Sequence, residues 1–126
     1  MTFDYIIDSY AWIEYYLGED VNLKLIIETK NIATPAVVIA ELSDKFTREK
    51  EDFNLFFQFI NSRSKIIPLS TEIALKSGKF KSEMRKKYKQ FGLVDAIIYL
   101  TAKMNNSQLL TGDPHFKGLD NVEFIE

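Results

Sequence analysis

Four acidic residues occupy positions from which their carboxylates could act together. Asp8 directly follows an apolar segment near the start of the chain, and Asp113 comes just after the pair Leu109–Leu110. Glu41 and Asp95 each lie among apolar residues rather than in a polar run. Taken singly, each acid has a structural explanation. Asp8 and Asp113 can cap helices, the helix dipole favours Asp95, and Glu41 could be half of an ion pair.

Short apolar segments rich in β-forming residues alternate with longer segments of helical periodicity. This alternation predicts an α/β domain with a central, mainly parallel sheet flanked by helices. The expected strands are residues 3–7, 31–34, 66–67, 108–110 and 122–125, and the expected helices are 9–17, 21–30, 35–46, 53–60, 71–89 and 93–104. Pro35 is expected in the first turn of its helix and Thr71 as a helix cap, and Gly78 could interrupt the long helix.

The predicted sheet brings the acids to one place. In an open parallel sheet, ligands bind beyond the carboxyl ends of the strands, where Asp8 and Asp113 lie. Two carboxylates about 4 Å apart repel by roughly 4 kcal/mol at an effective dielectric of about 20, so four of them need a cation between them. Oxygen donors favour Mg²⁺ or Mn²⁺ over zinc. Such an ion stabilises charge developing on a phosphate, which makes a phosphodiester the expected substrate.

The composition limits the chemistry to carboxylates, hydroxyls and basic groups. The 126 residues include no cysteine and one histidine, which excludes a thiolate zinc site, a cysteine nucleophile and a multi-histidine metal site. The length predicts a single domain over residues 1–126. The sequence contains neither a long apolar run nor a secretory signal pattern, so we expect a cytoplasmic protein without a membrane partner.

The chain resembles the PIN-domain ribonucleases, in particular the VapC-type toxins of archaeal and bacterial toxin–antitoxin pairs. The resemblance lies in four segments that occur in the same order as in the family. These segments are IIDSYAWIEYY (6–16), TPAVVIAEL (34–42), GLVDAIIYLTAK (92–103) and LLTGDPHF (109–116). Each segment alone is a weak signal, whereas four in order cover essentially the whole chain and form a strong one.

The resemblance implies a three-layer PIN-like fold and endonucleolytic cleavage of RNA that depends on Mg²⁺ or Mn²⁺. It also implies a homodimer and inhibition by a cognate antitoxin. By the same resemblance, Ser9 and Thr111 would be supporting hydroxyls, and the catalytic, metal-binding acids would be Asp8, Glu41, Asp95 and Asp113. One position departs from the family. Many relatives carry a small hydroxyl or amide residue where this chain has Tyr10, which leaves the hydrogen bonding of Asp8 open.

A basic segment precedes Asp95. Seven basic residues and one acid lie between positions 76 and 89, in a chain whose formal net charge is −2. This segment could follow an RNA backbone, where positive charge supplies most of the affinity, or it could be a solvated helix face. The residues we expect to bind RNA are Arg85, Lys86 and Lys89.

The remaining features leave alternatives open. His115 is interpreted as an incidental loop residue rather than a proton carrier. Most of the aromatic residues of segment 10–16 are interpreted as core or interface residues rather than as residues that stack on bases. Apolar residues on two faces of segment 53–60 indicate burial on both sides or a dimer surface. The alternatives to an RNA-cleaving toxin are a catalytically inactive RNA- or protein-binding module, a housekeeping nuclease and a DNA-directed nuclease.

Overall fold

Five parallel strands form one sheet in the order β3-β2-β1-β4-β5 within residues 2–125, the part of the chain that the computed structural model describes. The strands are β1 (Tyr5–Ile7), β2 (Ile32–Pro35), β3 (Lys65–Ile67), β4 (Gln108–Thr111) and β5 (Val122–Phe124). The helices are α1 (Ser9–Leu17), α2 (Val21–Thr29), α3 (Ala36–Arg48), α4 (Asn54–Arg63), α5 (Thr71–Arg85) and α6 (Leu93–Met104), with a 3₁₀ helix, η1 (Pro114–Phe116). The alternation of strands and helices confirms the predicted α/β class and the parallel sheet.

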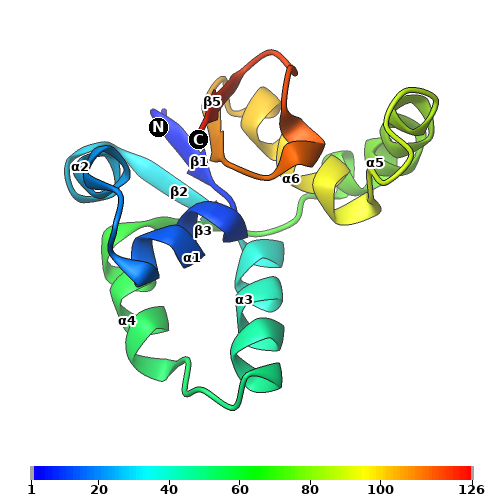
Figure 1. The fold of residues 1–126 in the computed structure, drawn as a ribbon. Coiled ribbons are helices and arrows are strands. Elements are labelled where there is room, and N and C mark those ends of the chain that lie inside the picture. The colour runs from blue at the N-terminus through cyan, green and yellow to red at the C-terminus, as the bar shows by residue number, and fades with distance from the viewer. Residues whose placement is uncertain (1, 126) are drawn as a thin grey trace.

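Helices cover both faces of this sheet. Figure 1 shows α1, α3 and α4 on one side and α6 on the other, with α5 extending beside α6. This three-layer arrangement confirms the fold that the family resemblance implied. None of the helices within residues 2–125 combines the length and the apolar character needed to cross a bilayer.

Trp12 lies at the centre of the core on the α1 side. Its side chain is fully buried, and its indole Nε1 donates a hydrogen bond to Thr34 Oγ1 at 3.1 Å. This bond satisfies the one polar atom that burial of the indole would otherwise leave without a partner. The rings of Phe56 and Phe59 on α4 pack edge-on against the indole. The interpretation of Trp12 as a core residue is therefore confirmed.

Phe59 explains most of the two-faced apolar pattern of α4 within the single chain. Its ring stacks on that of Tyr15 at 5.4 Å, so α1 covers this second face. Leu55 is the large apolar residue of α4 that stays exposed, with 78% of its surface accessible. The apolar character of Phe59 therefore reflects its packing against α1 within one chain. The homodimer stays a prediction.

Three details of the helix ends differ from the sequence-based expectations. Pro35 is the last residue of β2 and the cap of α3, so it precedes the helix instead of lying in its first turn. Ser70, not Thr71, caps α5, because its hydroxyl accepts the Ile73 N–H at 3.1 Å. The predicted helix 71–89 is too long, because α5 ends at Arg85, and Gly78 does not interrupt it.

The order of the strands creates a switch point between β1 and β4. The chain builds β1, β2 and β3 outward in one direction and then returns to place β4 on the other side of β1. Ile7 pairs with Leu110, so Asp8, which directly follows β1, and Thr111, the last residue of β4, lie side by side at the carboxyl edge of the sheet. Open α/β sheets bind their ligands at such a point.

Gly112 is a close-packed position at this edge. A Cβ atom there would lie 2.3 Å from Tyr10 Cε1 and 2.8 Å from the carbonyl oxygen of Ile125. The Tyr10 ring is a side chain that can move, but the Ile125 carbonyl belongs to the backbone, which β5 holds through the Ile125 N–H bond to Thr111 O. Tyr10, the departure from the family pattern, therefore packs over a glycine.

We expect Gly112→Ala to lower the free energy of unfolding by about 1–3 kcal/mol, because the new methyl group must displace backbone at the end of β5. Chemical denaturation monitored by circular dichroism measures this change. Gly78→Ala is the matched control, since nothing lies within 4 Å of a Cβ at Gly78 and alanine favours a helix interior. Equal stability of Gly112→Ala and the wild type would contradict the close packing.

Candidate active site

Asp8 is a buried carboxylate at the end of β1. Only 2% of its surface is exposed. Its Oδ1 accepts the Ala11 N–H at 3.0 Å, which caps α1, and its Oδ2 accepts the Thr111 hydroxyl at 2.5 Å. Burial raises the pKa of Asp8 to about 7, although both hydrogen bonds oppose this rise, and the charges of Asp113 and Glu41 add to it. One oxygen of the Asp8 side chain is thus held by α1 and the other by β4.

Asp95 is fixed by the start of its own helix. It lies in the first turn of α6, where its Oδ2 accepts the Gly92 N–H at 2.8 Å. Gly92 follows a tight turn that Phe91 anchors by its full burial. Arg85 Nε, at the end of α5, donates to the Phe91 carbonyl at 2.6 Å and closes this turn. The position of the Asp95 carboxylate therefore depends on the backbone just before α6.

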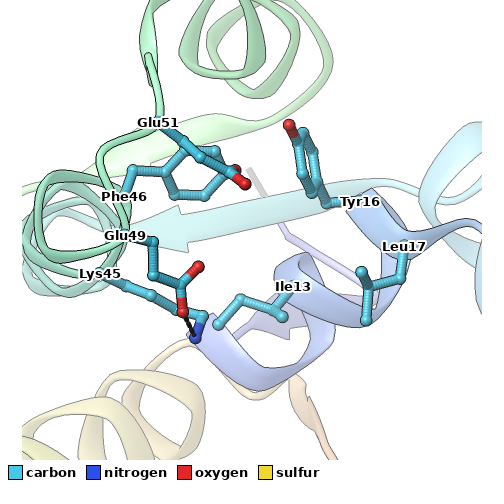
Figure 2. Close-up of a pocket in the computed structure, with 7 residues that line it drawn as sticks. All are labelled: Ile13, Tyr16, Leu17, Lys45, Phe46, Glu49 and Glu51. Atoms are coloured by element: carbon cyan, nitrogen blue, oxygen red, sulfur yellow. Dashed lines mark hydrogen bonds and ion pairs between the residues drawn. The ribbon is translucent and has the colours of Figure 1, made fainter.

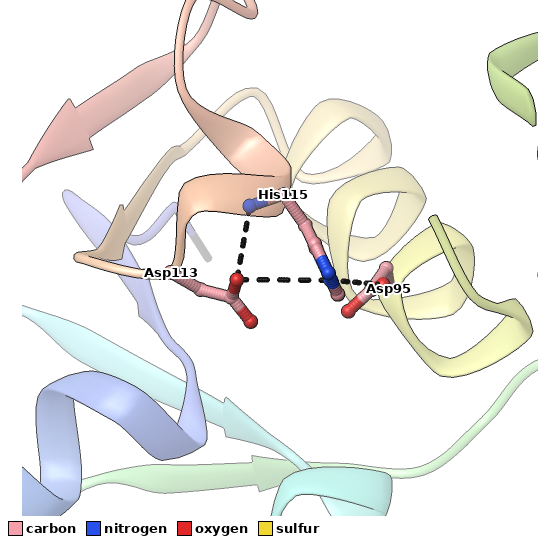
Figure 3. Close-up of side chains that lie close together, drawn as sticks. All are labelled: Asp95, Asp113 and His115. Atoms are coloured by element: carbon pink, nitrogen blue, oxygen red, sulfur yellow. Dashed lines mark hydrogen bonds and ion pairs between the residues drawn. The ribbon is translucent and has the colours of Figure 1, made fainter. Parts of the chain in front are cut away.

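Asp113 and His115 lie together after β4. The Asp113 N–H donates to Thr111 Oγ1 at 3.0 Å, and Asp113 Oδ1 accepts the His115 N–H at 2.9 Å, which caps η1. The ring nitrogen Nδ1 of His115 is 2.9 Å from Asp95 Oδ2 and 3.7 Å from Asp113 Oδ1. Figure 3 shows the imidazole between the two carboxylates. One ligand atom from each of these three residues lies within 4.8 Å of the others.

Glu41 reaches the same region from α3. The Ser9 hydroxyl donates to its Oε1 at 3.0 Å, which joins the first residue of α1 to the middle of α3. Burial raises the pKa of Glu41, the Ser9 bond opposes this, and the charges of Asp95 and Asp113 add to the rise. Glu41 and Asp8 are not members of the tight group around His115.

The four acids interact electrostatically, and within residues 2–125 none of them forms an ion pair with a lysine or arginine. Each of Asp8 and Glu41 has its pKa raised by other members of the set, so the charges are close enough to interact. Within residues 2–125, every ion pair made by a lysine or arginine involves an acid outside this set. Carboxylates gathered in this way repel each other unless a cation lies among them.

The donor set fits a divalent ion. Asp8, Asp95 and Asp113 present carboxylate oxygens from three segments that meet at the switch point, and Glu41 adds a fourth carboxylate nearby. Mg²⁺ and Mn²⁺ are the ions that bind carboxylates of this kind, usually with several waters retained. The candidate ligands are therefore the four acids that the sequence singled out.

The structure brings together most of the residues that sequence reasoning selected. Ser9 and Thr111 each donate a hydrogen bond to an acid of the set. The predicted RNA-binding residues lie at the end of α5: Lys86 is its C-terminal cap, Lys89 lies in the turn beyond it, and both are exposed. Arg85 is adjacent but already holds the Phe91 carbonyl.

His115 is the site residue that sequence reasoning missed. The sequence-based interpretation of His115 as an incidental loop residue is wrong, because its ring contacts two of the four acids. The signal available in the sequence was the spacing of two residues from Asp113. The contact with Asp95, twenty positions away, depends on the fold and could not be seen.

A separate hollow lies between α1 and the end of α3. Figure 2 shows side chains that surround this space of about 240 Å³. Its lining residues are Ile13, Tyr16, Leu17, Lys45, Phe46, Glu49 and Glu51. Its acids differ from the four above, since Glu49 and Glu51 are exposed and Glu49 pairs with Lys45 at 2.6 Å. The acids of this hollow are therefore more exposed than the four acids of the candidate site, and one of them pairs with a lysine.

Comparison with known families agrees with the observed fold. The family model of the PIN domain matches residues 5–122, which is nearly the whole chain, so the chain belongs to the PIN domain family. The search of curated proteins gave no significant match.

Two solved structures resemble the whole chain. One, the VapBC2 complex of Rickettsia felis bound to a DNA fragment from its promoter, is 25% identical and has a TM-score of 0.72. This similarity covers 97% of the present chain and 98% of the other. The second, a toxin–antitoxin complex from Klebsiella pneumoniae, is 24% identical over 94% of both chains, also with a TM-score of 0.72.

The buried carboxyl group of Asp8 makes stability depend on pH. Its pKa is near 3.8 in an unfolded chain and about 7 in the folded protein, so the folded state holds this proton more tightly. The protonated Asp8 carboxyl group therefore stabilises the folded state fully below pH 3.8, and this stabilisation is lost as the pH rises through about 7. In chelator at about pH 8, we expect Asp8→Asn to be more stable than the wild type by on the order of 1–3 kcal/mol.

Denaturation curves in chelator at several pH values measure this difference, which should narrow toward about pH 5. Asp20→Asn is the matched control, because Asp20 caps α2 with a 3.0 Å bond to the Leu23 N–H at a half-buried position. Subtracting its effect removes the contribution of the cap itself. A wild type that is the more stable protein at about pH 8 would show that Asp8 acts mainly as a cap.

Proposed function

We propose that the chain is a single PIN domain that hydrolyses RNA phosphodiesters as a metal-dependent endoribonuclease, and that it is the toxin of a toxin–antitoxin pair. The observation that carries the proposal is the convergence of Asp8, Glu41, Asp95 and Asp113 with no lysine or arginine paired to them in residues 2–125. Membership of the PIN domain family supports a nuclease, and the similarity to VapBC2 of Rickettsia felis supports the toxin role.

Each residue of the candidate site would have a distinct role in the cleavage reaction. A bound Mg²⁺ or Mn²⁺ would lower the pKa of a water and offset the charge that develops on the phosphate. Asp8, Asp95 and Asp113 would hold the ion, each kept in place by a backbone N–H of its own segment. The Ser9 hydroxyl would orient Glu41. Attack by water would leave a 5′-phosphate and a 3′-hydroxyl, whereas attack by the RNA 2′-hydroxyl would leave a cyclic phosphate.

The basic segment would supply the affinity for RNA, because the negative charge of the four acids opposes RNA binding. Lys86 and Lys89 lie in or beside the turn that leads through Phe91 and Gly92 to Asp95. A phosphate backbone bound there would be held next to the acidic site. Positive charge outside the site is needed because the carboxylates themselves repel a polyanion.

The partners of the proposal are RNA, a cognate antitoxin and a second copy of the chain in a homodimer, in the cytoplasm. Support for the antitoxin comes from the two similar structures, both of toxin–antitoxin complexes. The alternatives are a housekeeping nuclease, a DNA-directed nuclease and an inactive binding module. The presence of all four acids speaks against the inactive module, since a surface that only binds RNA would bind better without them.

Asp95→Asn should abolish cleavage. Asparagine keeps an oxygen for the Gly92 N–H but loses the charge that would hold the ion, so we expect RNA cleavage in Mn²⁺ to fall by more than about 100-fold. The measurement is a gel assay of mixed-sequence RNA with and without chelator. Asp44→Asn on α3, an exposed residue paired with Arg48, is the control and should retain full activity.

The same assay separates the alternatives. Single-stranded DNA of the same sequence tests the substrate, and end analysis of the products tests which oxygen attacks. Binding of RNA by the wild type without cleavage in either Mg²⁺ or Mn²⁺ would favour the inactive module, and cleavage that persists in chelator would refute the metal requirement.

Replacing Lys86 and Lys89 by glutamine should weaken RNA binding and its salt dependence. Each lost phosphate contact lowers the slope of log affinity against log salt by about 0.7 for a single strand. Binding is measured on the Asp95→Asn background, so that the RNA stays intact. Arg85 is left unchanged because its loss would also open the turn at Phe91.

The control for this measurement replaces two exposed lysines, Lys24 in α2 and Lys30 at its C-terminal cap, by glutamine. Figure 1 shows α2 and α5 at opposite sides of the molecule. This control removes the same charge far from the basic segment. Equal slopes for both double variants would refute a local RNA path.

A further inference from the structure

The His115 imidazole occupies a position that belongs to the acidic site. Its Nδ1 is 2.9 Å from Asp95 Oδ2 and 3.7 Å from Asp113 Oδ1, and the ring lies between the two carboxylates in Figure 3. Adjacent ligands of an octahedral ion with bonds of about 2.1 Å are separated by roughly 3 Å. The spacing around His115 is therefore close to that of a set of ligands around one ion.

The backbone holds the ring in this place. The His115 N–H donates to Asp113 Oδ1 at 2.9 Å, so the residue is attached to the acid that it faces. The next residue, Phe116, is buried and packs edge-on against Phe91, the anchor of the turn before Asp95. His115, Asp113 and Asp95 are thus fixed relative to one another by backbone caps and by a shared aromatic contact.

We propose that His115 supplies a ring nitrogen as a ligand to the divalent ion held by Asp95 and Asp113. This inference rests on the proposed function for the presence of the ion and goes beyond it in the donor set. Asp95 and Asp113 contribute oxygens, and the imidazole turns an all-oxygen site into a mixed nitrogen and oxygen site.

The proposal has a consequence for the choice of metal. Imidazole binds first-row transition metals better than Mg²⁺, which prefers oxygen donors and retained water. The chain should therefore favour Mn²⁺ over Mg²⁺ by more than carboxylates alone would provide. A ligating Nδ1 has no proton, so ion binding selects the ring form in which Nε2 carries it.

The chain offers an unusually direct test, because His115 is its only histidine. Protein without an affinity tag is loaded with Mn²⁺, and electron spin echo modulation is recorded with natural and with ¹⁵N-labelled histidine. We expect a nitrogen coupling of a directly bound imidazole in the wild type that changes on ¹⁵N labelling. The coupling should be missing in His115→Ala and in His115→Asn.

Calorimetric titration supplies the second readout. We expect His115→Ala to weaken Mn²⁺ binding by roughly 10-fold or more and Mg²⁺ binding much less, so that the preference for Mn²⁺ shrinks. His115→Asn separates a ligand from a positioning residue. Its amide nitrogen can replace Nδ1 as a hydrogen-bond donor to Asp95, so recovery of the Mn²⁺ preference in this variant would assign His115 a positioning role and overturn the proposal.

Lys117→Ala, an exposed change at the other end of η1, controls for disturbance of the loop and should keep the nitrogen coupling. Melting curves in chelator verify that each variant folds. Mn²⁺ bound by the wild type without histidine coupling would overturn this inference and leave the proposed nuclease intact. Failure of the folded wild type to bind Mn²⁺ or Mg²⁺ would overturn both.

Discussion

The candidate site depends on four buried or half-buried carboxyl groups at one edge of the sheet, with which no lysine or arginine within residues 2–125 forms an ion pair. Asp8 is the extreme case, since it is almost fully buried and accepts two hydrogen bonds, yet its pKa still rises to about 7. Hydrogen bonds to a carboxylate normally lower its pKa, so burial outweighs them here. Without an ion, taking up a proton relieves the cost of burying this carboxyl group, and under the proposed function a divalent ion would compensate the carboxylate instead.

Helix capping and metal binding are compatible roles for these acids. Asp8, Asp95 and Asp113 each accept a backbone N–H close to their own position in the chain. Those bonds prevent the carboxylates from turning away from one another to relieve their repulsion. The capping geometry that could explain each acid alone is therefore also the means by which the set stays together.

The sequence predicted what local patterns can encode. Strands, helices and the strand-end positions of Asp8 and Asp113 follow from short-range periodicity, and the structure confirms them. The neighbourhood of His115 was not predictable, because its contact with Asp95 joins η1 to α6 across twenty residues and depends on where β4 enters the sheet. The packing of Phe59 against α1 was hidden for the same reason, since periodicity describes a face but not its neighbour.

The turn between α5 and α6 joins the basic segment to the acidic site. Arg85 closes the turn on Phe91, and the next residue, Gly92, donates to Asp95. The Phe91 ring also packs edge-on against Phe116, beside His115. One buried aromatic residue thus links the basic segment, the first turn of α6 and the loop of Asp113. The position of Asp95 therefore depends on the same turn that Lys86 and Lys89 lie in or beside.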